Sequence, residues 1–481
     1  MQPYLRPFLE FLFALFAVDG FVWWQLDRQL RTRHRNTAWR IALAVVMVAL
    51  FGLCAVLLVR LHTHGRLRQY ARPFFDILFG LMAIDSWVWW RIDRLLRPVR
   101  RTTIWRIALA VMMLAVIGFA WLSFVANQQI ARTHQSIPPW LPASIYLWHF
   151  IVMPVTVVVL IAHWGLEAWR ESRRHLDALK PLPPESPAKQ HRPDDSCEKP
   201  RPLFSRRHFL AASALTLPPL SSLALAAVAE TQLGNFRIRR MDLQLPGWPA
   251  DLDGYTISVV ADIHTGVFST PKMLSDIVEQ TNQLRANLVL LPGDLINIAD
   301  ADLPAALAMV NQLDTRDGLF MVQGNHDLIQ GPGPFNSACL AANVPLLLDD
   351  AVTIQPRGHS PFQLLGTLWG DRDSRLYDSV NTVNSLRDPT LFPILMAHHP
   401  HSWDQAVKCQ LPLTISGHTH GGQIMLTENI GAGPLRFRYW SGIYRKPGST
   451  LVVSNGVGNW FPLRVNAPAE ILHLTLHPAH A

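Results

Sequence analysis

Five short motifs in the second half of the chain bring carboxylate, imidazole and amide side chains together at close spacing. They are Asp262-x-His264, Gly293-Asp294, Gly324-Asn325-His326-Asp327, His398-His399-Pro400 and Gly417-His418-Thr419-His420. Two side chains that leave the same turn can converge on one cation, and glycine allows the backbone to approach closely. This mixture of donors suits Mn, Fe or Zn better than Mg alone. The motifs therefore predict a metal centre that draws on five separated segments.

Each motif follows a short apolar segment that is typical of a buried strand. The predicted strands are Tyr255–Ala261, Leu288–Leu291, Leu319–Gln323, Ile394–Ala397 and Leu413–Ser416, and the predicted helices are Pro271–Leu284 and Leu303–Leu313. Alternating strands and helices, followed by strands with Gly-rich loops, indicate a sheet sandwich flanked by helices. Open α/β sheets bind ligands at the carboxyl ends of their strands, which is where the motifs fall.

The order of these motifs resembles that of the calcineurin-like metallophosphoesterases. The resemblance covers about residues 235–478, and three further segments narrow it: Gly421-Gly422-Gln423, Tyr439–Tyr444 and Val453–Gly458. These segments resemble a bacterial branch of membrane-associated or twin-arginine-exported phosphodiesterases. That branch is related to UDP-diacylglucosamine pyrophosphatases and to the animal transmembrane protein with metallophosphoesterase domain. The resemblance implies a four-layer α/β/β/α sandwich for residues 230–481.

The resemblance also implies roles for single residues. One divalent cation would be bound by Asp262, His264 and His420, and a second by Asn325, His398 and His418, with Asp294 bridging both. Two such cations clamp a phosphate and supply hydroxide at neutral pH for in-line attack on phosphorus. His326 is then placed to stabilise or protonate the leaving oxygen. Asp327 would orient His326, while His399 would either line the substrate site or be an ordinary loop histidine.

One departure from the wider superfamily narrows the substrate class. Gly293-Asp294 is followed by Leu295–Asp300, which lacks the Asp-Arg-Gly motif that the Ser/Thr protein phosphatases need. A protein substrate is therefore disfavoured. A second departure, Thr265 after the first Asp-x-His motif, touches no predicted ligand. The roles of Asn297, Asp300 and His401 stay open at this point.

The composition of the whole chain indicates that part of it lies in lipid, and the apolar runs place that part in the first half. Hydrophobic residues make up 49% of the 481 residues and charged residues 16%, against about 25% charged residues in soluble domains. Residues 6–45 also resemble residues 72–111 at a constant offset of 66, which indicates a duplicated two-helix hairpin. Apolar runs near the roughly 20 residues of a transmembrane helix predict five spans, at Phe8–Leu26, Ile41–Val59, Phe74–Trp90, Ile107–Ala126 and Ser144–Leu166.

Charge separates the two halves of the chain. Residues 1–229 carry 27 Lys and Arg against 13 Asp and Glu, whereas residues 230–481 carry 16 against 22. The basic residues therefore reflect membrane topology through the positive-inside rule and do not indicate nucleic-acid binding. A cytoplasmic location for the basic, Pro-rich linker at 167–207 predicts a multi-pass protein of a bacterial inner membrane, with its C-terminal half in the periplasm.

The segment that joins this linker to the C-terminal half has two interpretations. Ser205–Leu210 resembles a twin-arginine (Tat) export signal, and Ala227-Val228-Ala229 has the form of a cleavage site. The alternative is a plain sixth transmembrane helix over residues 208–229. The predicted domains are thus a membrane domain at 1–166, the linker at 167–207, this sixth span or signal at 208–229, and a metallophosphoesterase domain at 230–481.

The leading functional hypothesis is a membrane-anchored two-metal hydrolase of a phosphodiester or a pyrophosphate, with lipid-linked phosphates among the candidate substrates. An alternative is a UDP-2,3-diacylglucosamine-type pyrophosphatase of lipid A synthesis, which requires a cytoplasmic site. A hypothesis of another class is a membrane transporter or lipid-binding module with a regulatory phosphoesterase domain. Acidic residues at equivalent positions of the repeated apolar runs favour it, namely Glu10 with Asp76 and Asp19 with Asp85.

Overall fold

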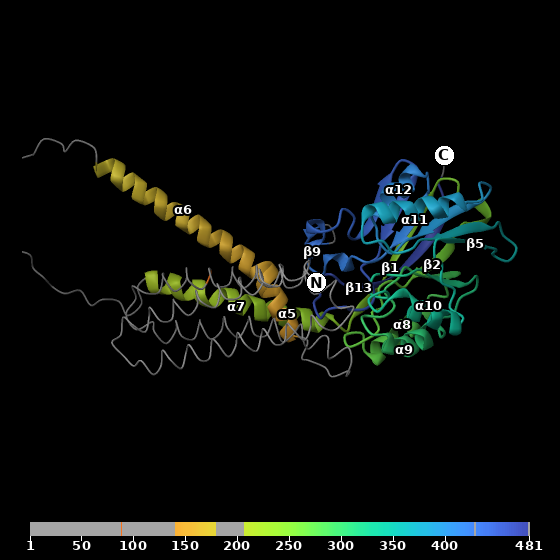
Figure 1. Cartoon of the computed structure of the whole chain (residues 1–481), viewed down its shortest axis with the longest axis horizontal. Helices are drawn as coiled ribbons and strands as arrows, with labels where there is room; N and C mark the ends of the chain where they lie inside the picture. Colours follow the sequence, from red (N-terminus) through yellow and green to blue (C-terminus); the bar gives the residue numbers. More distant parts are fainter. Residues whose placement is uncertain (1–87, 89–139, 179–205, 428–429, 480–481) are drawn as a thin grey trace, which may run out of the picture. The chain divides into compact units, whose positions relative to one another are not determined.

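The computed structural model describes residues 88, 140–178, 206–427 and 430–479 (Figure 1). The first four predicted spans, apart from the single position 88, lie outside these residues. The same holds for residues 179–205 of the linker. The duplicated hairpins are therefore a property of the sequence, and they stay a prediction.

Within the described residues 140–178 and 206–235, four helical segments precede the first strand. Helix α5 (Trp140–Leu147) continues through a π-turn, η2 (Trp148–Val152), into α6 (Met153–Ala178), and α7 spans Arg206–Gln232. The predicted fifth span and the segment 208–229 are therefore helical. In the described part of the chain, however, no helix combines the length and the apolar character that a membrane crossing requires. Neither of these two predicted spans is confirmed.

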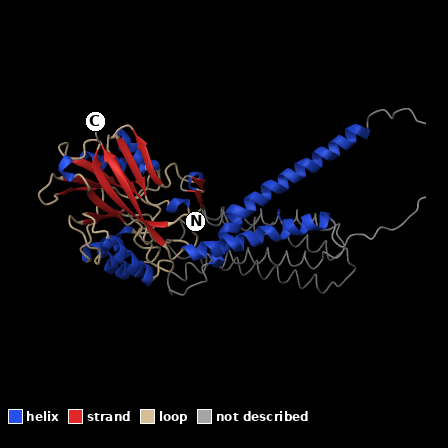
Figure 2. Cartoon of the chain, turned by 180° about the vertical axis from the view of Figure 1, so that it is seen from behind, coloured by secondary structure: helices blue, strands red, loops and turns tan. Residues whose placement is uncertain are grey.

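The first sheet of the C-terminal half carries three of the five motifs (Figures 1 and 2). Its strands pair in the order β1-β13-β2-β3-β4, and β2, β3 and β4 run parallel to one another. Because parallel strands end at the same edge, the loops after these three strands leave the sheet side by side. The strands are β1 (Phe236–Leu245), β13 (Ala469–Pro478), β2 (Tyr255–Val259), β3 (Leu288–Leu291) and β4 (Leu319–Met321).

The second sheet carries the two remaining motifs, after β7 and β8. Its order is β11-β12-β8-β7-β6-β5, and its four central strands are parallel. A separate short hairpin, β9 (Met425–Thr427) with β10 (Ile430–Gly431), follows the last motif. The strands of the second sheet are β11 (Gly442–Lys446), β12 (Ser449–Val453), β8 (Leu413–Ser416), β7 (Phe392–Met396), β6 (Phe362–Gly366) and β5 (Asp350–Ile354).

The two sheets pack face to face, and helices cover their outer faces. In β3, for example, Leu288 and Leu290 join the core between the sheets, while Val289 and Leu291 pack against helices, as the two-residue period of a strand requires. On the first sheet these helices are α8 (Pro271–Gln283), α9 (Leu303–Val310) and α10 (Pro332–Ala341); on the second they are α11 (Asp373–Ser385) and α12 (Ser402–Lys408). The predicted α/β/β/α sandwich is confirmed for this half of the chain.

Short 3₁₀ turns complete the domain, and two of them border the motifs. Turn η5 (His420–Gly422) contains the last predicted ligand, and η4 (Asp300–Asp302) follows the loop of Asp294. The others are η3 (Ala250–Leu252) and η6 (Gly433–Leu435). The candidate site is therefore built from the loops and short turns that follow the strands, and not from the α-helices.

Candidate metal centre

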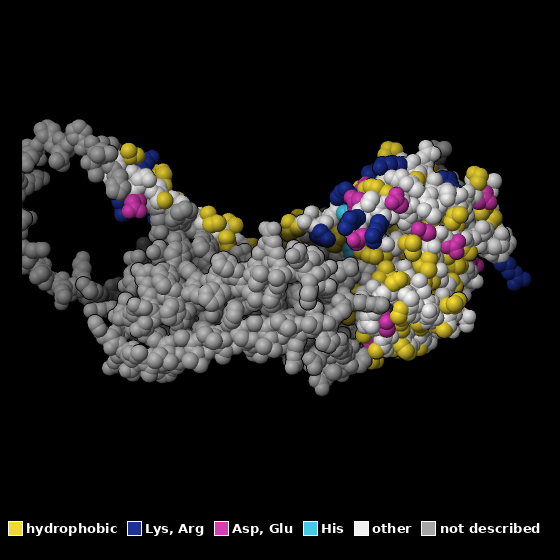
Figure 3. Space-filling model, viewed as in Figure 1, with side chains coloured by type: hydrophobic (Ala, Val, Ile, Leu, Met, Phe, Trp, Pro, Cys, Tyr) yellow, Lys and Arg dark blue, Asp and Glu magenta, His cyan; other side chains and the backbone are white. Residues whose placement is uncertain are grey.

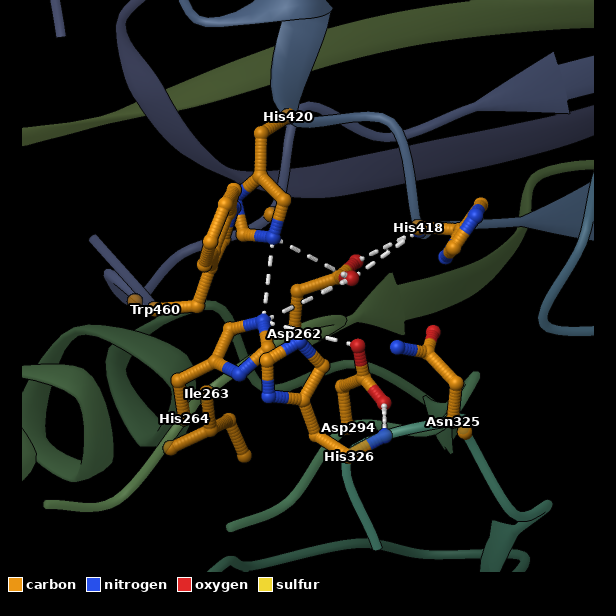
Figure 4. A network of polar contacts seen from close by, with 12 residues as sticks. Asp262, Ile263, His264, Asp294, Asn325, His326, His418, His420 and Trp460 are labelled. Carbon is orange, nitrogen blue, oxygen red and sulfur yellow. Dashed lines mark hydrogen bonds and ion pairs between the residues drawn. The ribbon is translucent and has the colours of Figure 1, made fainter. Parts of the chain in front are cut away.

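The first group of candidate ligands is Asp262, His264 and His420. The two imidazoles face one another, with Nε2 of His264 lying 3.0 Å from Nε2 of His420. Oδ1 of Asp262 lies 4.0 Å from the first of these nitrogens and 3.5 Å from the second. Figure 4 shows both rings turned toward the Asp262 carboxylate from the same side. These distances show that the polar atoms of the three side chains converge on one small volume. All three side chains are buried, so this volume is shielded from bulk water.

The second group contains Asn325, His398 and His418. Nε2 of His398 lies 3.2 Å from Oδ1 of Asn325 and 3.1 Å from Nδ1 of His418. The other ring nitrogen of His398 donates to the carbonyl of Pro292 at 2.6 Å. That hydrogen bond fixes the ring orientation and directs Nε2 at the group, an arrangement typical of metal-binding histidines.

Asp294 lies between the two groups. Its Oδ2 is 3.5 Å from Nε2 of His264 and 3.3 Å from Nε2 of His398. Its Oδ1 accepts a hydrogen bond from the backbone N–H of His326 at 2.8 Å. One carboxylate oxygen therefore reaches both groups while the other is held by the backbone, which is the position predicted for a bridging ligand.

Five of the candidate ligands have a left-handed backbone conformation. Asp262, His264, Asp294, His418 and His420 all have positive φ, between 47° and 74°. Residues other than glycine rarely adopt this backbone conformation, because it costs roughly 1–3 kcal/mol for each residue. Backbone hydrogen bonds between the loops hold it, because the N–H groups of Asp262 and His264 donate to the carbonyls of Gly293 and Asp294.

Two glycines in the motifs have a steric explanation. A Cβ atom at Gly324 would collide with the Asp294 carboxylate, and one at Gly417 would collide with the Asp262 carboxylate. Both carboxylates therefore occupy space that only glycine leaves free. The prediction that glycine permits a close backbone approach is confirmed at these positions.

His326 lies beside the first group, and its ring is fixed from one side. Nδ1 contacts the backbone carbonyl of Asn297 at 2.6 Å, and the ring packs edge-on against His264 with centroids 4.5 Å apart. Because a carbonyl only accepts, Nδ1 carries a proton and Nε2 is the free nitrogen of this ring. The sequence left the role of Asn297 open, and the structure shows that its backbone carbonyl orients the His326 ring.

Asp327 does not orient His326 as predicted. Its buried carboxylate instead accepts four backbone hydrogen bonds of 2.8–3.1 Å, which come from the N–H groups of Asp294, Leu295, Ile296 and Gly324. The sequence pattern suggested the wrong partner because adjacent side chains on one turn can point in different directions. Asp327 therefore stabilises the loop that carries Asp294, and acts on the candidate bridging residue through the backbone.

One tryptophan, Trp369, packs against the histidines of the second group and against His399. The Trp369 ring lies 5.0 Å from His418, 5.3 Å from His398 and 5.6 Å from His399, measured between centroids. Burial, together with the neighbouring His401, lowers the pKa of His399 to about 2, so its ring is neutral. His399 thus borders the second group, as predicted for a residue of the substrate site, although its contact with substrate stays a prediction.

Comparison with known proteins finds a family match for the segment that carries the motifs. Residues 255–422 match the family model of the calcineurin-like phosphoesterases, and this segment contains all five motifs. The chain contains a calcineurin-like metallophosphoesterase domain. The resemblance inferred from the motifs is confirmed.

Relatives of this metallophosphoesterase domain occur in bacteria and animals. An uncharacterized metallophosphoesterase of Helicobacter pylori J99 is 30% identical over 46% of this chain and 60% of its own length. The transmembrane protein with metallophosphoesterase domain of Danio rerio is 27% identical over 50% of this chain and 57% of its own. Phosphodiesterase YaeI of Escherichia coli K12 is 26% identical over 57% of this chain and all of its own. The chain thus spans about 60% of the first of these relatives.

The candidate ligands of the metallophosphoesterase site differ in their pKa values. Burial lowers the pKa values of His264, His418 and His420 well below the usual range, so these rings are neutral and offer lone pairs. Although burial opposes ionisation, His398 holds the pKa of Asp294 well below its usual range, and Asp294 raises the pKa of His398 to about 9. Burial raises the pKa of Asp262 to about 7. Neutral imidazole and ionised carboxylate are the forms that bind metal, so a cation would displace a proton from His398 and part of one from Asp262. With those protons released, the donor set fits divalent cations at both groups.

Sequence analysis missed one buried charge behind this site, Arg464. Its guanidinium Nη2 lies 3.0 Å from Nδ1 of His420 and donates to the carbonyl of Gly458 at 2.7 Å. Its Nη1 donates to the carbonyls of Asn455 and Ala467, both at 3.1 Å. Burial lowers its pKa to about 10, with Asp262 opposing the shift. Arg464 thus ties the loop after β12 to a candidate ligand, 44 residues away in sequence.

Arg464→Met should destabilise the domain by about 3–5 kcal/mol, the scale seen when one partner of a buried polar network is removed. Methionine fills a similar volume, but the carbonyls around it lose their donors and His420 loses its support. Denaturant unfolding, followed with and without added Mn, measures the effect. The exposed Arg357→Met is the matched control and should unfold like the parent chain. Equal stability of the two variants would contradict this role of Arg464.

Proposed function

We propose that this protein is a metal-dependent phosphoester hydrolase that binds two divalent cations. The single observation that carries the proposal is the position of Asp294, whose Oδ2 lies within 3.5 Å of an imidazole of each ligand group. Asp262, His264 and His420 would hold the first cation. Asn325, His398 and His418 would hold the second. Bound cations would supply Lewis-acid stabilisation of phosphate and a nucleophile at neutral pH.

The chain's own residues would contribute orientation and proton transfer. The Asp327 carboxylate holds the loop of Asp294 through four backbone N–H groups. The Asn297 carbonyl fixes His326 through its Nδ1–H. When the ring also carries a proton on Nε2, that proton can pass to a leaving oxygen, which leaves the neutral Nδ1–H ring. The buried ring pairs exclude bulk water from the ligand atoms, which strengthens electrostatic interactions there. This division of roles supports hydrolysis of a phosphate ester.

Among phosphate esters, we favour a phosphodiester or a pyrophosphate. The name of one relative, phosphodiesterase YaeI, supports a diester, and the absence of an Asp-Arg-Gly motif after Asp294 disfavours a phosphoprotein. The test is a screen of the full chain against aryl phosphodiesters, cyclic dinucleotides and lipid pyrophosphates, with Mn, Zn and Mg compared. Turnover of a diester or pyrophosphate that a chelator abolishes is expected. Metal-independent turnover, or none with any of the three metals, would contradict the proposal.

We further propose a periplasmic location for the domain and a lipid-linked phosphate as its substrate. The charge difference between the two halves of the chain supports the location. A membrane tether would favour substrates on the same surface through effective concentration. Protease added to spheroplasts should cleave the domain from outside. Protection of the domain would instead favour the cytoplasmic UDP-2,3-diacylglucosamine-type pyrophosphatase.

A further inference from the structure

The segment that follows the last candidate ligand forms a rim beside the site. We define the rim as residues 425–427 and 430–446, which include β9, β10 and β11. It begins five positions after His420 and returns to the site at Phe437, whose ring centroid lies 5.4 Å from that of His418. The next backbone N–H, that of Arg438, donates to Nε2 of His401 at 3.2 Å. The rim thus contacts the candidate ligand His418 through Phe437 and the neighbouring His401 through Arg438.

Three aliphatic side chains of the rim face solvent. Leu426 is 77% exposed, Ile430 57% and Leu435 90%. Their exposure does not reflect a loosely attached hairpin, because the neighbouring Met425 is buried against Trp440. Single exposed apolar residues are ordinary, but three within ten positions beside a candidate active site indicate a contact surface.

The charge of the rim is opposite to that of the domain. Residues 230–481 carry 16 basic against 22 acidic residues, whereas residues 425–446 carry four basic residues and one acidic residue, Glu428. Arg438 and Lys446 form ion pairs with Asp404. The other two, Arg436 and Arg445, are exposed and form no ion pair with any residue that the structure describes. Figure 3 shows dark blue side chains gathered on the part of the domain where histidine is also visible.

We propose that the rim docks the domain onto an anionic phospholipid surface. Aliphatic side chains on a short hairpin, with arginines beside them, match the interface of a bilayer, where apolar groups enter the acyl boundary and basic groups meet lipid phosphates. The hairpin of β9 and β10 forms a sheet of its own, apart from both large sheets (Figure 1). Net positive charge on an otherwise acidic domain makes anionic lipid the matching surface.

Docking through the rim would place the candidate centre at headgroup depth. Phe437 and Arg438 contact the histidines of the site directly, so no large movement separates the lipid contact from the ligands. A phosphoester carried by a lipid would then meet the centre without leaving the bilayer. This consequence for substrates rests on the proposed hydrolase function, whereas the docking itself does not.

Hydrogen exchange of the full chain tests the docking. The chain is purified in detergent and returned to vesicles of phosphatidylcholine, with or without phosphatidylglycerol. Anionic vesicles should slow amide exchange across the rim by about tenfold relative to detergent, and neutral vesicles should slow it less. The exposed turn that contains Leu386 should not change. Equal exchange of the rim in detergent and in anionic vesicles would overturn the proposal, as would equal protection by both kinds of vesicle.

A double variant separates docking from catalysis. Leu435→Ser with Arg436→Gln should abolish the slowing of exchange by anionic vesicles and leave hydrolysis of soluble bis(4-nitrophenyl) phosphate unchanged. Leu340→Ser with Arg357→Gln is the matched control, because Leu340 is 80% exposed on α10 and Arg357 is exposed in a loop. It should keep the protection. Protection that survives in the rim variant would overturn the proposal. Protection without any soluble hydrolysis would support docking while contradicting the proposed function.

Discussion

Asp294→Asn should release both cations and lower turnover by about 10³-fold or more. Its Oδ2 is the atom that reaches an imidazole of each group, at 3.5 Å and 3.3 Å. Asparagine keeps the shape and can still accept from the backbone N–H of His326, but it removes the negative charge between two cations. The cations would then repel one another without compensation. Bound metal contributes several kcal/mol to the transition state, and each 1.4 kcal/mol is a factor of ten in rate.

Metal analysis after gel filtration, together with turnover of an aryl phosphodiester, measures this effect. Asp314→Asn is the control, since that aspartate is exposed and lies away from the ligand loops. It should keep two cations and normal turnover. The assignment of Asp294 as the bridging ligand would be wrong if the Asp294 variant retained two ions and near-normal turnover. Loss of one ion with retention of the other would assign Asp294 to a single group.

The sequence predicts the candidate ligands well because they follow the strands that are easiest to recognise. Strands β3 and β8 lie at the predicted residues, Leu288–Leu291 and Leu413–Ser416, and both are buried at every position. Strand β3 is an unbroken apolar run, whereas β8 alternates apolar residues with Thr414 and Ser416. Strands buried on both faces are rich in apolar residues, so they contrast with the polar motifs that follow them. The polar side chain that follows such a strand stands out without any knowledge of the fold.

One strand that the sequence did not predict, β1, has a weaker pattern. Strand β1 alternates exposed and buried positions only in its second half and carries Arg237, Arg239 and Arg240. Its pairing with β13 joins residues more than 230 positions apart. Glu470 on β13 is buried and accepts hydrogen bonds from Arg237 at 3.0 Å and 3.1 Å. A buried glutamate in a strand resembles a surface residue until its distant partner is known.

The same reason explains which site residues were missed. Arg464 and Trp369 come from loops outside the five motifs, and each reaches the site only through the folded chain. Asp327 lies in a motif, yet its partners are backbone N–H groups that the sequence cannot display. Local pattern thus identifies atoms that could bind a cation, whereas the residues that hold those atoms in place depend on tertiary contacts.

His326→Ala should keep both cations and lower kcat by about 10²–10⁴-fold, the usual scale of acid–base assistance. The ring is held by the Asn297 carbonyl at Nδ1 and packs against His264, so its free Nε2 is the atom placed to act on the leaving oxygen. His326 also has its backbone N–H on Asp294, at 2.8 Å, and that hydrogen bond survives in alanine. The variant therefore removes the ring without removing the support of the candidate bridge.

Leaving groups of different basicity decide whether His326 donates a proton. A nitrophenolate leaves without protonation, so the loss in His326→Ala should be smallest for nitrophenyl diesters and should grow for alkyl diesters, whose oxygens need a proton. His359→Ala, which replaces an exposed loop histidine, should behave like the parent chain with every substrate. An equal loss for good and poor leaving groups would mean that His326 orients substrate or stabilises charge without transferring a proton. A fall in bound metal would instead place its ring among the ligands, beside His264 and Asp294, with which it could share a cation.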